Sequence, residues 1–508
     1  MSLSIQLAPL DLTVDSTAKT QPQKIVAFTR SLLHTEPLYA TSRLLEELKL
    51  LNRQKMDADT RISSLELYRK ITLELSHELE LVYGEASTPL SREGAHSAAL
   101  AEALWLETGY GYKRALVDLK HKLFNLHEDK QHSLVILRIL ESLKNQALVN
   151  YLTYTAPPAS LWSDLHKMYF HALQLSLEDV EVKPHSLINN KTINLVYIQV
   201  LLMNLANPTR LDKPSIKKMA HYVASLAKYA ELRGMGIIEN ANGVFLIELD
   251  SQKSAVPYLK NRNTPNVETD ILLVTVEVAR QIHQQLKYIQ RNKHISEAPL
   301  PTTALDVVDE DLLTHLIKYF GTNSTRAFPR LEKKYSADLA IGLEASCILF
   351  RSKKRINDDV LSEWEIMNIS PDGYALRTSH LFELAVNVGD LITIIDHQNN
   401  LWSVGRIIWL SAKPDHLEAG IKLLAPSATS IAIKPQSKNE FNNALLLPDI
   451  KAVSEPISIV AYRGYLMERS VIDIKTGNKK SKLQIKQLIE RSGSFERFEY
   501  SLIEHELS

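Results

Sequence analysis

The 508-residue sequence contains a single cysteine, Cys347, which excludes an intrachain disulfide and any zinc site built from several cysteines. Cys347 lies in an apolar run, so we expect a buried structural thiol rather than a nucleophile. Neither sign of charge is in excess, because 59 Lys and Arg residues balance 59 Asp and Glu residues. The whole chain is therefore not attracted to nucleic acid or anionic membrane, and any site for an anion must be local.

Long apolar runs are also missing. One uncharged stretch, residues 192–209, is interrupted by Asn194, Gln199, Asn204 and Pro208. Its unbroken apolar part is shorter than the roughly 20 residues that cross a bilayer, so we expect a buried core helix. The first residues lack a basic start followed by an apolar core, and we expect a cytoplasmic protein without a membrane span.

Common catalytic motifs are absent. The sequence has no Gly-x-x-x-x-Gly-Lys phosphate loop and no Gly-x-Ser-x-Gly elbow. The nearest approach to a metal motif is His127-Glu128, but the second histidine, His132, comes one residue too late for His-Glu-x-x-His. The sequence therefore predicts no enzyme, no metal and no cofactor.

The first part of the chain shows mainly helical periodicity. Residues 1–22 carry little helix signal and are expected to form a loosely ordered arm. Residues 23–300 are predicted to form a helical domain, in which apolar side chains recur at steps of three and four, as at Leu65, Tyr68, Ile71, Leu75, Leu79 and Val82. Gly109 and Gly111 interrupt one helical segment and predict a kink. Asn242-Gly243 between two alternating runs predicts a β-hairpin near 236–249.

After residue 300 the pattern changes. Residues 301–323 are predicted to form a linker and a helix, Asp306–Phe320. The next region, 324–425, contains alternating runs typical of a small barrel, at 346–350, 363–369, 391–395 and 402–410. Residues 426–508 are again β-rich, with runs at 444–447, 457–461, 465–474 and 482–489, and predict either a separate domain or an extension of the barrel. The fold class is therefore multidomain, with an all-α N-terminal region followed by β structure.

Two short motifs frame the start of the barrel. Arg326 and Arg330 lie four residues apart, and Asn368, Ser370 and Gly373 form Asn-x-Ser-x-x-Gly. Guanidinium groups grip phosphates and reach the edge of guanine, asparagine both donates and accepts, and glycine allows a tight turn beside a ligand. Each motif alone is an ordinary basic linker or turn. Together they predict a receptor site for a small, anionic, guanine-containing ligand.

With these residues, the region 324–425 resembles the PilZ domain family, whose pattern is Arg-x-x-x-Arg followed by Asp/Asn-x-Ser-x-x-Gly. Runs at 388–390, 405–409 and 420–424 are similar to the family as well, whereas the basic insert 351–359 departs from it. The resemblance implies a six-stranded barrel that binds cyclic di-GMP. The ligand-binding residues that it implies are Arg326, Arg330, Asn368, Ser370 and Gly373.

The resulting hypothesis is a non-enzymatic cyclic di-GMP receptor that relays the signal to a protein partner through the helical region. The resemblance suggests outputs in motility, pili, adhesion or biofilm formation. One alternative is an interaction scaffold whose barrel has lost nucleotide binding, and another is an enzyme with a PilZ regulatory module, against which the missing catalytic motifs count. Because both motifs end before Pro426, we expect residues 426–508 to be dispensable for nucleotide binding.

Overall fold

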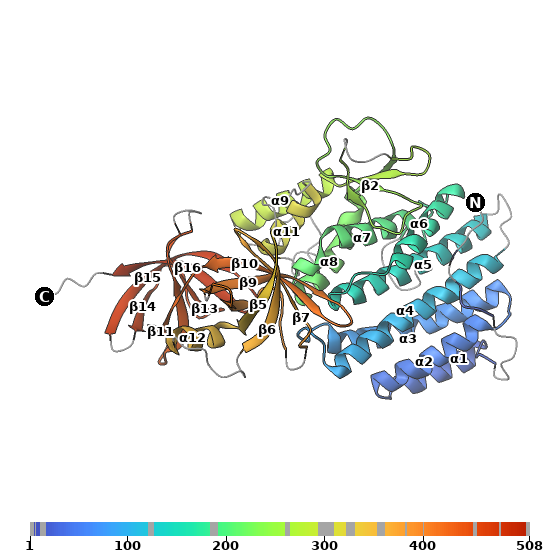
Figure 1. The fold of residues 1–508 in the computed structure, drawn as a ribbon. Coiled ribbons are helices and arrows are strands. Elements are labelled where there is room, and N and C mark those ends of the chain that lie inside the picture. The colour runs from blue at the N-terminus through green and yellow to red at the C-terminus, as the bar shows by residue number, and fades with distance from the viewer. Residues whose placement is uncertain are drawn as a thin grey trace. The chain divides into compact units, whose positions relative to one another are not determined.

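The computed structural model describes residues 5, 7–10, 17–119, 126–182, 191–259, 265–292, 309–321, 331–352, 361–381, 384–399, 401–450, 455–476 and 479–503. The chain divides into two compact units (Figure 1). The first comprises residues 1–86, 90–208 and 213–325. The second comprises residues 326–508 together with the short segments 87–89 and 209–212.

Helices build most of the first unit, and several begin at a side chain that caps the first turn. The Asp57, Ser91 and Thr192 side chains accept hydrogen bonds from the backbone amides of Thr60, Gly94 and Leu195. Among them, α3, α4 and α5 lie side by side (Figure 1). The described helices are α1 (Pro22–Leu32), α2 (Pro37–Arg53), α3 (Ala58–Tyr83), α4 (Arg92–Asp118), α5 (Leu126–Leu152), α6 (Ala159–Gln174), α7 (Ile193–Leu205), α8 (Lys213–Leu226), α9 (Val276–Asn292) and α11 (Glu310–Gly321).

Two features of the helical core confirm the sequence reading. The apolar stripe of α3 is buried from Leu65 through Leu79, whereas Val82 at its end is exposed. The uncharged stretch at 192–209 contains the buried helix α7, as expected. No helix among the described residues is long and apolar enough to cross a membrane.

The sequence predicted a kink at Gly109 and Gly111, and in the structure α4 continues through both glycines as one helix. A Cβ atom at Gly111 would lie 2.6 Å from Asn52 Oδ1 and 2.8 Å from Leu65 Cδ2. The glycine is therefore needed for the close packing of α4 against α2 and α3. In the same contact the Asn52 side-chain amide donates to the Glu107 carbonyl at 2.7 Å.

The expected hairpin near 236–249 is also wrong. Asn242-Gly243 does form a turn, but the first unit contains a four-stranded sheet in the order β1-β4-β2-β3. Its strands are β1 (Glu231–Gly234), β2 (Val244–Ile247), β3 (Val256–Pro257) and β4 (Ile271–Val274). Strand β4, from a later part of the chain, lies between β1 and β2. A local turn signal does not reveal such a long-range partner.

A buried histidine should make the helical unit sensitive to acid. His166 Nε2 lies 2.7 Å from the Lys253 carbonyl and Nδ1 lies 2.7 Å from Tyr197 Oη. Since a carbonyl only accepts, Nε2 carries the proton and Nδ1 accepts from Tyr197. Burial lowers the pKa of His166 to about 4. The unfolded chain therefore binds a proton more readily than the folded one, and folding is weakened as pH falls from about 6.5 toward 4.

We expect this group to cost the helical unit about 3 kcal/mol of stability between pH 7 and pH 4. Urea unfolding followed by helical circular dichroism at both pH values measures the loss. His166→Gln keeps a donor and an acceptor but does not titrate, so its stability should fall less over the same interval. An equal pH dependence in the two proteins would contradict the prediction.

The second unit begins with a closed barrel in the order β10-β7-β6-β5-β8-β9. The six-stranded barrel implied by the sequence is thus confirmed, as are the expected strands at 363–369, 391–395 and 402–410. The strands are β5 (Leu331–Ile341), β6 (Leu361–Ser370), β7 (Gly373–Thr378), β8 (Leu391–Asp396), β9 (Leu401–Ala412) and β10 (Leu417–Ala425).

The run at 346–350 was expected to be a strand. It is instead part of the helix α12 (Leu343–Ser352). Short apolar runs do not distinguish strand from buried helix, and Leu343, Cys347 and Phe350 also fit a helical spacing. Cys347 is fully buried, as expected, and burial raises the pKa of its thiol to about 12. Residues 353–359, which make up most of the basic insert 351–359, lie outside the described residues.

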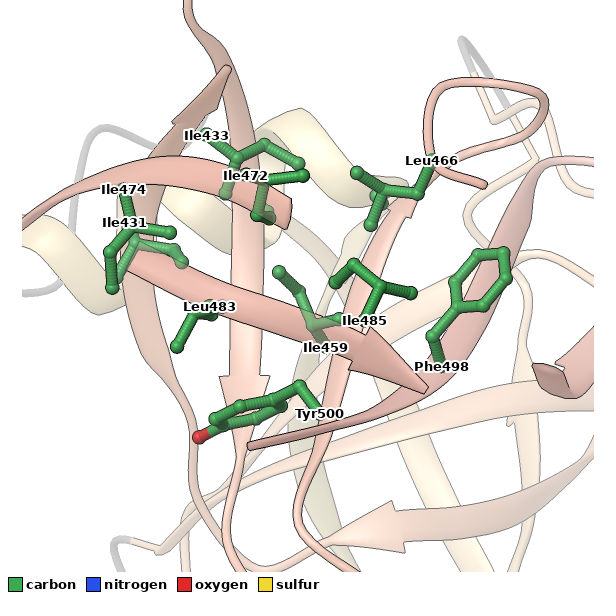
Figure 2. Close-up of a cluster of buried hydrophobic side chains, with 12 residues drawn as sticks. Ile431, Ile433, Ile459, Leu466, Ile472, Ile474, Leu483, Ile485, Phe498 and Tyr500 are labelled. Carbon is green, nitrogen blue, oxygen red and sulfur yellow. The ribbon is translucent and has the colours of Figure 1, made fainter. Parts of the chain in front are cut away.

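Residues after 428 form a second closed barrel in the order β11-β12-β13-β16-β15-β14, so the C-terminal segment is a barrel of its own. Figure 2 shows its core, in which Ile433, Ile459 and Ile485 point inward. The expected strand at 465–474 begins only at Val471. The strands are β11 (Thr429–Pro435), β12 (Asn442–Leu447), β13 (Ser458–Tyr462), β14 (Val471–Thr476), β15 (Lys479–Arg491) and β16 (Phe495–Ile503).

The two barrels share a hydrophobic core through α12. One buried cluster joins Leu343, Cys347, Leu391, Val404, Leu424 and Ala425 to Leu445, Leu447, Val460 and Phe495 of the second barrel. The Asn443 amide also donates to both carboxylate oxygens of Glu344, at 2.9 Å each. A chain ending near Ala425 would expose this core, so point substitutions test the role of the second barrel better than truncation does.

Candidate functional site

The predicted site residues that the structure describes lie on the outer face of the first barrel. The Arg377–Glu418 ion pair, with Nη2 and Oε1 2.8 Å apart, marks this face, whereas Leu376 and Ile421 point into the core. Alternation along the strands then places Asn368, Ser370 and Gly373 on the same outer face. Strand register aligns two rows there, Asn368–Ala375–Gly420–Trp409 and Ser370–Gly373–Lys422–Arg406.

Irregular pairing positions Asn368. The β5–β6 register shifts between Glu332 and Tyr335, and the β6–β7 register shifts between Ile366 and Asn368. Bulges of this kind redirect side chains and are common next to functional sites. Asn368 is half-buried, so its amide combines a defined position with access from solvent.

The Ser370 hydroxyl is engaged within its own turn. Oγ lies 2.6 Å from Asp372 Oδ1 and 3.2 Å from the Gly373 carbonyl, both of which accept. One hydroxyl has a single proton to donate. A ligand that accepts from Ser370 must therefore displace the exposed Asp372 carboxylate.

A glycine is required at position 373 for a structural reason that the sequence did not reveal. A Cβ atom at this position would lie 1.8 Å from the Ile421 carbonyl oxygen and 2.9 Å from the Ile421 carbonyl carbon. These are backbone atoms of β10, which pairs with β7. The glycine is therefore required by the close approach of two barrel strands.

Small residues keep the centre of this face shallow. Ala375 and Gly420 are neighbours across β7 and β10, and a Cβ atom at Gly420 would lie 1.6 Å from Trp409 Nε1. The Trp409 indole thus lies directly over Gly420 and remains partly exposed. A flat aromatic ring beside a hydrogen-bonding side chain is suited to a nucleobase.

Two cations at the edge of the same face were missed by the sequence analysis. Lys422 on β10 is paired in register with Gly373 on one side and with Arg406 on the other. Both side chains are half-buried. Both residues belong to strand runs noted in the sequence. Their neighbours depend on strand register, which brings together residues up to about 50 positions apart in this row.

Arg326 and Arg330 lie outside the described residues. The described chain resumes at Leu331, the residue that follows Arg330, and Leu331 is paired with Ile369. Glu332 is paired with Asn368. The described part of β5 therefore begins beside the Asn-x-Ser-x-x-Gly segment.

In the part of the chain that the structure describes, no group of three His, Cys, Asp or Glu side chains could hold a metal ion. The outer face of the first barrel instead combines amide, hydroxyl, indole and cationic groups. That set of groups can bind an anion that carries a base.

Three family models match successive parts of the chain. Residues 23–235 match "Cyclic-di-GMP receptor FimW, N-terminal domain". Residues 351–430 match "Cyclic-di-GMP receptor FimW, middle PilZ domain", and residues 428–503 match "FimW C-terminal beta-barrel domain". The middle match includes Asn368, Ser370 and Gly373 but begins after Arg330. The N- and C-terminal regions, to which the sequence analysis assigned no family, are therefore similar to known domains.

One relative is similar to this chain over most of its length. The chain is 21% identical, over an alignment 538 positions long, to a protein of Pseudomonas aeruginosa described as "Cyclic-di-GMP receptor FimW". The alignment covers 90% of this chain and 86% of the relative. The similarity thus extends over the helical region and both barrels, not over the middle domain alone.

Proposed function

We propose that this chain, whose middle barrel is a PilZ domain, is a receptor that binds cyclic di-GMP on the outer face of that barrel. The observation that carries the proposal is the corner between β6 and β7, where Asn368, Ser370 and Gly373 stand together beside Lys422. The relative named as a cyclic di-GMP receptor supports the same ligand.

Each residue has a role that follows from its chemistry. Arg326 and Arg330 grip the phosphates and stack on or pair with guanine. The Asn368 amide reads a base edge, and Ser370 donates to the ligand after leaving Asp372. Gly373 keeps β7 and β10 close, so that the corner stays in place.

The nucleotide signal then passes to a protein partner. The helical unit is the part of the chain large enough to present a binding surface, and we propose it as the partner-binding region. The resemblance suggests an output in motility, pili, adhesion or biofilm formation. The receptor itself is proposed to be cytoplasmic and to catalyse no reaction.

Isothermal titration of cyclic di-GMP into the full chain tests the proposal. We expect saturable binding, with cyclic di-AMP competing at least about tenfold less well because the wrong base edge leaves Asn368 unpaired. Equal competition by the two nucleotides would contradict base reading. No binding of either nucleotide would favour the scaffold alternative, in which the barrel serves only in assembly.

Asp372 should limit affinity. Its carboxylate accepts from Ser370 and places a negative charge where the ligand phosphate is expected. Asp372→Asn keeps the acceptor but removes the charge, and we expect cyclic di-GMP to bind up to about fivefold more tightly, an effect that shrinks as salt is added.

Asp415→Asn is the matched control for Asp372→Asn. Asp415 is exposed and precedes β10, whereas the Asp372 carbonyl accepts from Leu423 near the end of that strand. The two positions are about 20 Å apart along β10, well beyond the Debye length. An equal gain from both variants would show a general charge effect and contradict the role of Asp372.

A further inference from the structure

Lys422 is a cation at the edge of the outer face that carries the proposed site. It is paired in register with Gly373, which in turn is paired with Ser370. Within the described residues Lys422 makes no ion pair or hydrogen bond through its side chain, whereas Arg377 and Arg406 on the same face are paired. The carboxylate of Asp372, in the turn that precedes Gly373, accepts a hydrogen bond from Ser370.

Arg406, the next cation along the row, is held by the second barrel. Its Nη1 lies 2.5 Å from Oε1 of Glu490 on β15. The two side chains are 29% and 12% exposed, so the pair is largely shielded from solvent. A partly buried pair is screened less by salt than a surface pair is.

Glu490 is positioned by the way the barrels are joined. The shared core through α12 and the Asn443–Glu344 contact fix the second barrel on the first. Gly389 lies against Ser492 and Gly493, and the Ser494 hydroxyl donates to the Gly389 carbonyl at 3.4 Å. The second barrel therefore presents one carboxylate to the edge of the outer face of the first.

We propose that the second barrel takes part in nucleotide binding: Lys422 contacts a ligand phosphate, and Glu490 sets the charge beside it by holding Arg406. This inference rests on the proposed function and names one further binding residue, Lys422, and an ion pair beside it, Arg406–Glu490. It also differs from the expectation that residues 426–508 are dispensable for nucleotide binding.

Cyclic di-GMP titration into the full chain tests the role of Lys422. Lys422→Met keeps most of the aliphatic stem but removes the charge, and affinity should fall about tenfold, or 1.4 kcal/mol. The loss should shrink as salt rises, because a charge contact is screened. Lys422→Arg should retain binding within about threefold. Equal affinity of Lys422→Met and the wild type would remove Lys422 from the site.

The role of Glu490 is tested from both sides of its ion pair. Glu490→Gln frees Arg406 and should tighten binding about threefold to tenfold at low salt. Arg406→Gln leaves the carboxylate uncompensated and should weaken binding by a similar factor. The double variant should return close to wild type. Thermal unfolding of each variant identifies any that does not fold. If only one single variant folds, its change in affinity still shows whether the prediction holds.

Glu418→Gln is the matched control for Glu490→Gln. It breaks the other Arg–Glu pair of this face with the same change in net charge, and Glu418 lies about 13 Å from Lys422 along β10. Its affinity should equal that of the wild type. Equal gains from Glu418→Gln and Glu490→Gln would overturn the specific role of Glu490. If the wild type itself binds no cyclic di-GMP, the proposed function fails, whereas wild-type binding with unchanged variants overturns this inference alone.

Discussion

Replacing Arg326 or Arg330 by alanine is expected to weaken binding of cyclic di-GMP at least about tenfold, and replacing both should abolish detectable binding. A hydrogen bond to a charged group contributes about 1.5–3 kcal/mol, and each guanidinium can make two of them to a phosphate. Arg326→Lys and Arg330→Lys keep the charge but lose the bidentate geometry, so an intermediate loss is expected. Isothermal titration with the full chain measures each affinity.

The fold should be unaffected by the arginine substitutions. Surface substitutions away from packed features usually change stability by less than about 1 kcal/mol, and thermal unfolding should show this for both alanine variants. Arg43→Ala is a matched control, because Arg43 forms an exposed pair with Glu46 on α2 in the helical unit. Wild-type affinity in both Arg326→Ala and Arg330→Ala would show that these arginines do not anchor the ligand.

Local patterns in the sequence predicted much of the fold. Alternation located β6, β8 and β9, and apolar spacing located the buried face of α3, because both depend only on nearby residues. The run at 346–350 was assigned wrongly because a short apolar run fits either period. The sheet around β4 was missed because its central strand arrives from a distant part of the chain.

The site was predictable only where residues are close in sequence. Asn368, Ser370 and Gly373 form one contiguous motif, and the structure keeps them together on one corner. Lys422 and Arg406 join them through the pairing of β7, β10 and β9, and Glu490 comes from a different barrel. The register and the docking of two barrels fix these neighbours, and neither leaves a signal in a single sequence.

Gly373 illustrates how one motif residue can serve the fold rather than the ligand. The sequence suggested a tight turn beside a ligand, but the structure shows a steric demand from the backbone of β10. The steric constraint lies where β7 and β10 pair. The pairing of these two strands is needed to close the barrel. Loss of binding on substitution would therefore accompany loss of structure.

Gly373→Ala is expected to destabilise the second unit by about 3 kcal/mol or more, because its Cβ would lie 1.8 Å from the Ile421 carbonyl oxygen. A backbone carbonyl cannot move aside as a flexible side chain can, so β7 and β10 must separate. Thermal unfolding measures the loss of stability. Gly236→Ala is the matched control, since no atom lies within 4 Å of its added Cβ, and it should cost less than about 1 kcal/mol.

Titration of Gly373→Ala below its unfolding temperature separates the two explanations of the motif glycine. If the steric demand of β10 is the main constraint, the loss of affinity should follow the loss of folded protein, because the ligand needs an intact corner at Asn368 and Ser370. A variant as stable as the wild type that no longer binds cyclic di-GMP would contradict this account. The glycine would then be required by the ligand, and β10 would have room that the present geometry does not show.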